Sequence, residues 1–181
     1  MKIMFMSDIH GSVKYTQLGI EKFIEEEATH LVLLGDLMYH GPRNPLPTEY
    51  DPKEVATCLN KFKNKIIAIR GNCDSEVDQM LLEFPIMSDF TEILLPNYKI
   101  FATHGHIYDK NNMPPLNKGD IFIHGHFHLP MAEKINDIFY LNPGSITLPK
   151  ENNKNSYGIL NNDIFSIKDL EGNVIKEIKI L

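Results

Sequence analysis

The stretch from Ile3 to Ser12 reads Ile-Met-Phe-Met-Ser-Asp-Ile-His-Gly-Ser and joins a wholly apolar run to a polar cluster. The run Ile3–Met6 is too short for the apolar core of a signal peptide, and a membrane-spanning helix needs about 20 such residues. Asp8 and His10 follow at once, where a signal peptide would carry small residues before its cleavage site. We therefore predict a first buried strand and a cytoplasmic protein.

The same arrangement recurs along the chain, because other apolar runs also lead directly into Asp, Asn or His beside a glycine. These runs are Leu31–Leu34, Ile66–Ile69, Ile100–Ala102 and Ile121–Ile123. The polar side chains that follow them include Asp36, Asn72, Asp74, His104, His106, His124, His126 and His128. Ligands of open α/β sheets bind at the carboxyl ends of the strands, so we expect these side chains to converge.

Helical periodicity separates the first strands. Val55, Cys58, Leu59 and Phe62 fall on one helix face, after Asp51 as a candidate N-cap and Pro52 at the first helical position. Ser12 is a candidate cap for an earlier helix ending near Glu27, and a short third helix is expected over Ser75–Leu82.

The second half of the chain instead shows hairpin signals, with turns at Asn161–Asp163 and Glu171–Asn173. Strand–helix units followed by hairpins predict an α/β protein of two packed sheets with helices outside. We expect residues 1–181 to form a single domain, because no linker or low-complexity segment interrupts them.

The polar side chains have the spacing and chemistry of metal ligands. Asp8 and His10 are two residues apart, as are His126 and His128, so each pair projects to one side of extended chain. Carboxylate, imidazole and amide groups without paired thiolates suit Mn²⁺, Zn²⁺ or Fe. A single Asp after glycine, such as Asp36, is more often a turn residue or cap. The occurrence of ligand-type side chains at the ends of five separate strands nevertheless favours a metal site.

The charge and cysteine content of the chain limit the classes of partner that it can bind. The formal net charge is −6, and the 18 Lys and Arg residues do not cluster, which argues against extended nucleic-acid binding. A small phosphorylated substrate remains compatible, because a bound metal can supply positive charge. The two cysteines allow at most one disulfide, and no membrane segment is expected. Apolar residues of the final hairpins fit either the core or a homo-oligomer interface.

The ordered set of Asp8 and His10, Asp36, Asn72, His104, and His126 and His128 resembles the signature of the calcineurin-like metallophosphoesterase superfamily. The segments Ser7–Ser12, His40–Asn44, Gly71–Met80 and Asn142–Ser145 are similar to the small bacterial YfcE-type phosphodiesterases. The resemblance implies a four-layer α/β/β/α sandwich of two packed mixed sheets flanked by helices. It also implies two divalent metal ions, Mn²⁺ first, with Zn²⁺ or Fe as alternatives.

Carried over by position, the resemblance assigns Asp8, His10, Asp36 and His128 to one metal. It assigns Asp36, Asn72, His104 and His126 to the other, so that Asp36 bridges. The expected reaction is hydrolysis of a small phosphodiester by a hydroxide generated at the two ions.

Further residues receive roles around this centre. Asn72, Cys73 and His104 are assigned to catalysis, Arg43 and His106 to substrate binding, and Asp74 to orienting a neighbouring ligand. Cys73 stands where many relatives carry a His that protonates the leaving group. A thiol near two cations ionises readily and is then a poor proton donor, which predicts a preference for good leaving groups. The alternative role for Cys73 is packing, and His106 is equally compatible with a structural role.

Two other functions remain open from the sequence. A phosphomonoesterase would use the same metal site, since the preference for diesters rests on the resemblance. A non-catalytic protein-binding scaffold of this fold is disfavoured because all seven ligand positions are intact.

Overall fold

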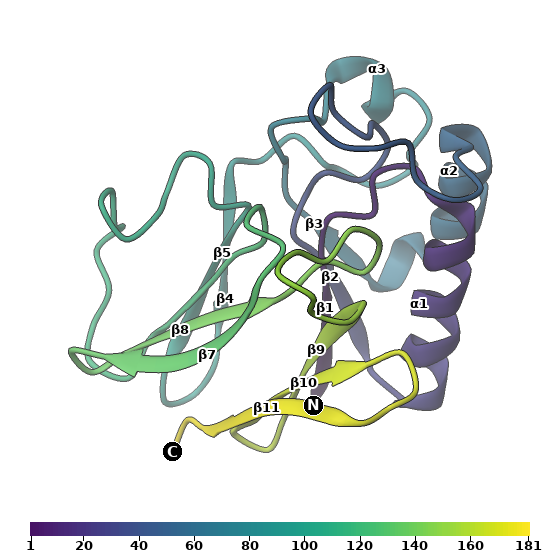
Figure 1. Cartoon of the computed structure of the whole chain (residues 1–181). Coiled ribbons are helices and arrows are strands. Elements are labelled where there is room, and N and C mark those ends of the chain that lie inside the picture. Colours follow the sequence, from purple (N-terminus) through teal and green to yellow (C-terminus); the bar gives the residue numbers. More distant parts are fainter.

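The computed structural model describes all 181 residues, and its strands follow the apolar runs of the sequence (Figure 1). The helices are α1 (Val13–Glu25), α2 (Pro52–Asn60) and α3 (Glu76–Gln79), with a 3₁₀ turn at Lys63–Lys65. The strands are β1 (Lys2–Met6), β2 (His30–Leu33), β3 (Ile66–Ala68), β4 (Phe90–Leu94), β5 (Lys99–Thr103), β6 (Ile121–Ile123), β7 (Pro130–Ile135), β8 (Ile138–Pro143), β9 (Ser156–Asn161), β10 (Ile164–Asp169) and β11 (Val174–Lys179).

The first sheet has the strand order β11-β10-β9-β1-β2-β3, in which β1, β2 and β3 run parallel and β9, β10 and β11 pair antiparallel. Its central strand β1 is buried on both faces. Met4 and Met6 pack toward the helices, whereas Ile3 and Phe5 pack toward the second sheet. Burial on both faces explains why the sequence from Ile3 to Met6 is continuously apolar rather than alternating.

Both helix starts expected from the sequence are confirmed. The hydroxyl of Ser12 accepts a hydrogen bond from the Tyr15 N–H at 3.5 Å, and Asp51 accepts from the N–H groups of Lys53 and Glu54 at 3.1 Å. Helix α3 is shorter than expected. The amide of Gln79 donates to the carbonyls of Leu82 and Phe84, which replaces a further helical turn with a side-chain bond.

The second sheet has the order β4-β5-β6-β8-β7, with β5, β6 and β8 parallel and the outer strands antiparallel. The expected α/β fold of two packed mixed sheets is confirmed. Helices cover only the first sheet, because no segment after Gln79 is helical. On the outer face of the second sheet, the ring of Tyr108 contacts Phe90 and Phe101 in place of a helix.

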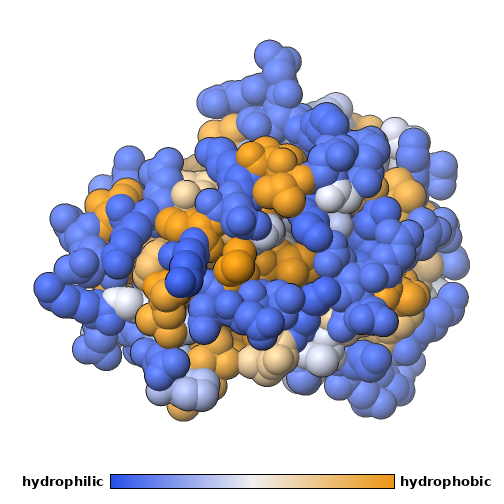
Figure 2. Space-filling model, turned by 90° about the horizontal axis from the view of Figure 1, so that it is seen from below, coloured by the Kyte–Doolittle hydropathy of each residue, from blue (hydrophilic) through white to orange (hydrophobic).

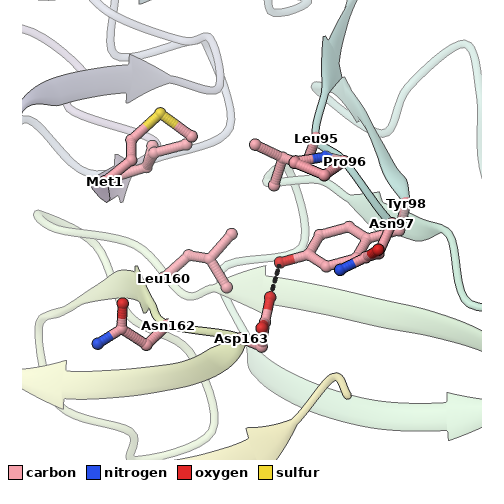
Figure 3. A pocket seen from close by; sticks show the side chains of 9 residues that line it. Met1, Leu95, Pro96, Asn97, Tyr98, Leu160, Asn162 and Asp163 are labelled. Atoms are coloured by element: carbon pink, nitrogen blue, oxygen red, sulfur yellow. Dashed lines mark hydrogen bonds between the residues drawn. The ribbon is translucent and has the colours of Figure 1, made fainter.

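The strands β1, β2 and β3 begin at the end of the sandwich that Figure 2 shows from below, where apolar side chains gather within a polar surround. A cavity of about 250 Å³ at this end is lined by Met1, Leu95 and Leu160, among others (Figure 3). The Tyr98 hydroxyl donates to Asp163 at 2.9 Å and links turns of the two sheets. None of the helices has the length and apolar character that crossing a bilayer would demand.

Candidate functional site

The polar side chains that follow β1, β2, β3, β5 and β6 meet at the opposite end of the sandwich, as the sequence predicts. Backbone hydrogen bonds join the segments that carry them. The Asp8 N–H donates to the Gly35 carbonyl at 3.1 Å, and the Gly125 N–H donates to the His104 carbonyl at 2.9 Å. The first bond lies within the first sheet and the second within the second sheet, and the His126 N–H joins the two by donating to Asp8 Oδ2 at 3.2 Å.

Three histidines of this edge are fixed in one tautomer by the backbone. The Nδ1–H groups of His10, His104 and His128 donate to the carbonyls of Tyr39, Leu34 and Leu148 at 2.9, 2.6 and 2.6 Å. A neutral imidazole that donates from Nδ1 has an acceptor lone pair on Nε2. In their neutral form the three rings therefore direct an Nε2 lone pair toward the interior of the site.

The first cluster of acceptors consists of Asp8, His10 and His128. The Nε2 atoms of the two histidines lie 3.4 Å apart, and Asp8 Oδ1 lies 3.2 Å from His128 Nε2 and 3.8 Å from His10 Nε2. Asp8 Oδ1 is buried and has no hydrogen-bond partner. Buried acceptors that face one another without a donor fit a bound cation.

The second cluster repeats this arrangement around His104. Its Nε2 lies 3.2 Å from Asn72 Oδ1, 3.3 Å from His126 Nδ1 and 3.5 Å from Asp36 Oδ2. Asp36 Oδ2 is also 3.8 Å from His10 Nε2, so one carboxylate lies between the two clusters. Oxygen and nitrogen donors around a shared carboxylate fit a pair of divalent ions.

The carboxylates of the site favour positive charge on the neighbouring histidines. Burial alone would lower the pKa of His104, but the hydrogen bond to Asp36 and the charges of Asp8 and Asp36 raise it to about 9. Burial, followed by the charge of His104, lowers the pKa of His126 to about 4. Without metal the carboxylates thus favour protonated histidine, because Asp8 also raises the pKa of His128 against the effect of burial, and a cation would take the place of such a proton.

The backbone is left-handed at five of the seven predicted ligands. The φ angles are 58° at Asp8, 51° at His10, 55° at Asp36, 66° at His126 and 60° at His128. Such angles are uncommon outside glycine and are most accessible to Asn, Asp and His. Non-glycine residues in this region cost free energy and cluster at functional sites. The side chains therefore leave sharply turned loops rather than extended strands.

Two glycines make room for these loops. A Cβ added at Gly71 would collide with the carboxylate and backbone nitrogen of Asp36, and one added at Gly125 would collide with the Ser7 hydroxyl. Asp74 holds the backbone of the Asp36 loop in place. Its carboxylate accepts from the N–H groups of Asp36, Leu37 and Gly71 at 2.7, 2.8 and 2.7 Å. Burial, and then the charge of Asp36, raise the pKa of Asp74 to about 6.

A cavity of about 300 Å³ opens over the two clusters, and we call it the site pocket. Among the residues expected from the sequence, it is lined by Asp36, Arg43, Asn72, Cys73, His126 and His128. His106 does not line it. Its ring packs against His104 and His126, at centroid distances of 5.4 and 6.3 Å, and its buried Nδ1 has no partner.

Sequence reasoning assigned no role to the five other lining residues, which are Gly41, Pro42, Asn44, Phe127 and Lys150. Phe127 could have been suspected, because it stands between His126 and His128. Lys150 has no local signal, since it reaches the site through a bond from its N–H to the His128 carbonyl at 3.2 Å. Arg70 pairs with Asp89 at 2.6 Å and lies outside the lining.

Cys73 borders both the site pocket and the acceptor clusters. Its N–H donates to Asp36 Oδ1 at 2.8 Å, and its sulfur, with acceptors of His10 and Asp36, forms a group whose ligand atoms all lie within 4.8 Å of one another. Burial, and then the charge of Asp36, raise the pKa of the Cys73 thiol. In the absence of cations the thiol is therefore neutral, and it lies close enough to the clusters to be an additional ligand.

The comparison with family models agrees with this geometry. The model of the calcineurin-like phosphoesterase superfamily domain matches residues 1–163. The chain belongs to this superfamily. Phosphodiesterase YfcE of Escherichia coli strain K12 is 52% identical over 167 residues, which cover 92% of this chain and 91% of that protein.

Solved structures of other proteins show the same fold. The E. coli phosphoesterase YfcE superposes with a TM-score of 0.98 at 48% identity, over 100% of both chains. Vps29 of Entamoeba histolytica, solved with zinc, has a TM-score of 0.65 at 19% identity over 100% of both chains, a likeness of fold alone. The calcineurin-like family accounts for the paired acceptor clusters, since metallophosphoesterases act through divalent ions.

Proposed function

We propose that this chain is a metal-dependent phosphodiesterase that hydrolyses a small phosphodiester at a binuclear centre. The observation that carries the proposal is the pair of acceptor clusters that share Asp36 beneath a pocket lined by Arg43 and Lys150. The relative that is 52% identical is named a phosphodiesterase, and the full-length structural likeness supports the same activity here.

The two clusters would hold the metals. Asp8, His10, Asp36 and His128 would bind one ion, and Asp36, Asn72, His104 and His126 the other, with Asp36 bridging. The donor set, with Cys73 at its edge, suits Mn²⁺, Zn²⁺ or Fe, and we propose Mn²⁺. When bound, such ions supply Lewis acidity to both the phosphoryl group and the attacking water.

Side chains of the protein would bind the substrate and orient the metal ligands. Arg43 and Lys150 line the pocket, where a guanidinium and an ammonium would bind the non-bridging phosphoryl oxygens. The Nδ1–H bonds of His10, His104 and His128 to backbone carbonyls hold each ring in the orientation that directs Nε2 inward. Cys73 lies beside the clusters, where we place it near the leaving group, and His106 would act through the rings of His104 and His126.

The direct test is hydrolysis by metal-stripped protein, with and without added Mn²⁺. Bis-p-nitrophenyl phosphate and p-nitrophenyl phosphate would be compared side by side. Asp36→Asn serves as the inactive control, because it weakens the shared carboxylate, and Asp163→Asn makes the same change at the far end of the sandwich. We expect manganese-dependent turnover that favours the diester.

Preference for the monoester would retain the metal site but replace the substrate class. No turnover of either ester across Mn²⁺, Zn²⁺ and Fe would overturn the proposal and favour a protein-binding scaffold.

We further propose that residues 1–181 act as one domain, supported by the shared core between the sheets. We also propose that the protein is cytoplasmic, supported by two unpaired cysteines.

A further inference from the structure

Phe127 stands at the boundary between two cavities. Its ring meets the ring of His126 edge to face at 5.1 Å on one side and the ring of His124 at 5.5 Å on the other. It lines the site pocket and also a second, larger cavity, and its exposed fraction is 44%. Phe127 is therefore the residue that the linings of the two cavities share, and it presents a half-exposed aromatic ring.

We call the second cavity the apolar groove. It has a volume of about 500 Å³, within the range of small-ligand sites. Its apolar lining consists of Phe122, Phe127, Leu129, Met131, Ile135 and Tyr140. Strands β6, β7 and β8 contribute most of these side chains from the outer face of the second sheet, which no helix covers (Figure 1).

The groove and the site pocket differ in chemistry. The site pocket has Pro42 and Phe127 as its only apolar lining residues and carries the cations Arg43 and Lys150. These side chains suit a phosphate group but offer little to a hydrocarbon. The groove offers apolar surface, including Phe127 and Ile135, whose exposed fractions are 44% and 45%. Exposed apolar surface beside a polar site is typical of a ligand-binding groove.

We infer that the substrate is a phosphodiester with one hydrocarbon arm, which crosses the Phe127 ring and lies in the apolar groove. This inference rests on the proposed function and specifies its substrate class. Water adds to phosphorus while one P–O ester bond breaks, so the products are a phosphomonoester and an alcohol. The hydrocarbon arm is the ester group retained on phosphorus in the assay below, and the other ester group leaves.

The test uses two diesters with the same leaving group, p-nitrophenyl methyl phosphate and p-nitrophenyl hexyl phosphate. Full-length manganese-loaded protein should prefer the hexyl ester by at least about tenfold in kcat/KM, since each buried methylene contributes roughly fourfold to binding. The preference should appear mainly in KM, because the hydrocarbon binds alike in the ground and transition states. Equal kcat/KM for the two esters would overturn the inference and leave the proposed function intact.

Ile135→Glu places a charge at an exposed position of the groove, so the protein should fold while the hexyl-to-methyl ratio falls toward one. Leu94→Glu is the matched control, because Leu94 is 76% exposed on β4 of the same sheet and outside the groove. It should retain the ratio. An unchanged ratio in Ile135→Glu would contradict the assignment.

A binding measurement can test the apolar groove independently of the proposed hydrolytic activity. Hexylphosphonate and methylphosphonate, whose C–P bonds resist hydrolysis, would be titrated into metal-loaded protein by calorimetry. Tighter binding of hexylphosphonate that Ile135→Glu abolishes supports the groove, even if neither ester is hydrolysed. Equal binding of both phosphonates overturns the inference whatever the activity.

Discussion

The carboxylate of Asp74 fixes the backbone of Asp36, because it accepts the Asp36 N–H at 2.7 Å and the neighbouring Leu37 N–H at 2.8 Å. A third bond, from the Gly71 N–H, ties the same carboxylate to the loop after β3. Asp74 thus joins the two loops that carry Asp36 and Asn72. Buried carboxylates with several N–H donors orient metal ligands without touching the metal.

Asp74→Asn should therefore weaken metal binding while leaving every ligand in place. An amide has one acceptor oxygen and a donor NH₂ group, so it cannot accept from all three N–H groups. We expect Mn²⁺ affinity, measured by calorimetry, to fall roughly 10–100-fold. Asp78→Asn is the control in the same segment, because Asp78 caps α3 and does not contact Asp36. Unchanged affinity in Asp74→Asn would refute the role.

Cys73→His should make the reaction less sensitive to the leaving group. Without cations burial raises the pKa of the Cys73 thiol, and beside two cations the thiol ionises, so it is a poor proton donor in either state. An imidazolium at the same position can protonate the departing oxygen. The measurement is log kcat/KM against leaving-group pKa for a series of aryl diesters, and the slope should become flatter. Cys73→Ser and the remote Cys58→Ser should leave it unchanged. The same slope in Cys73→His would mean that Cys73 only packs.

Arg43→Ala should reduce kcat/KM roughly 10–100-fold, mainly through KM, because it removes a charge-assisted hydrogen bond to phosphate. Arg43→Lys should fall between, since an ammonium keeps the charge but cannot bind two oxygens in one plane. Lys118→Ala removes the same charge from a remote pair with Asp137 and should have no effect. Steady-state kinetics at fixed ionic strength check this, and equal losses in both alanine variants would indicate only a general charge effect.

Metal affinity should rise with pH. The pKa of His104 is about 9 in the folded metal-free protein, against about 6.5 unfolded, so its proton must leave before a cation binds Nε2. One released proton gives about a tenfold gain in affinity per pH unit up to about pH 9. Calorimetry in two buffers of different ionisation enthalpy would measure the released proton. Affinity independent of pH between 7 and 9 would contradict the assignment.

The folding stability of the metal-free protein should instead fall as the pH rises. A raised folded pKa contributes stability that is fully present below the unfolded value of about 6.5 and is lost as the pH rises through about 9. Urea unfolding of metal-free protein should therefore show lower stability at pH 9 than at pH 7. His104→Gln, which cannot titrate, should lose this part of the pH dependence.

The sequence predicted the convergence of the site because strand ends are local features. Asp8, Asp36, Asn72, His104 and His126 each follow an apolar run, and parallel strands bring such ends to one edge. The caps Ser12 and Asp51 were predictable for the same local reason.

Features that depend on distant segments could not be predicted. Lys150 reaches the site by pairing with the His128 backbone, and the tautomers of the histidines depend on carbonyls of other loops. The bare outer face of the second sheet follows from the absence of a helix after Gln79, where the turn-rich sequence between His104 and Asp120 gives no periodic pattern.

The left-handed backbone at Asp8, His10, Asp36, His126 and His128 has a consequence for the evolution of this chain. Substitutions at these positions must satisfy two constraints, the chemistry of metal binding and the positive φ angle of the backbone. The positive φ angle disfavours β-branched residues whatever the protein does. A lineage that abandoned the reaction would still keep Asn, Gly, Asp or His at these positions to remain folded. Natural variation at these five sites therefore records foldability as well as activity.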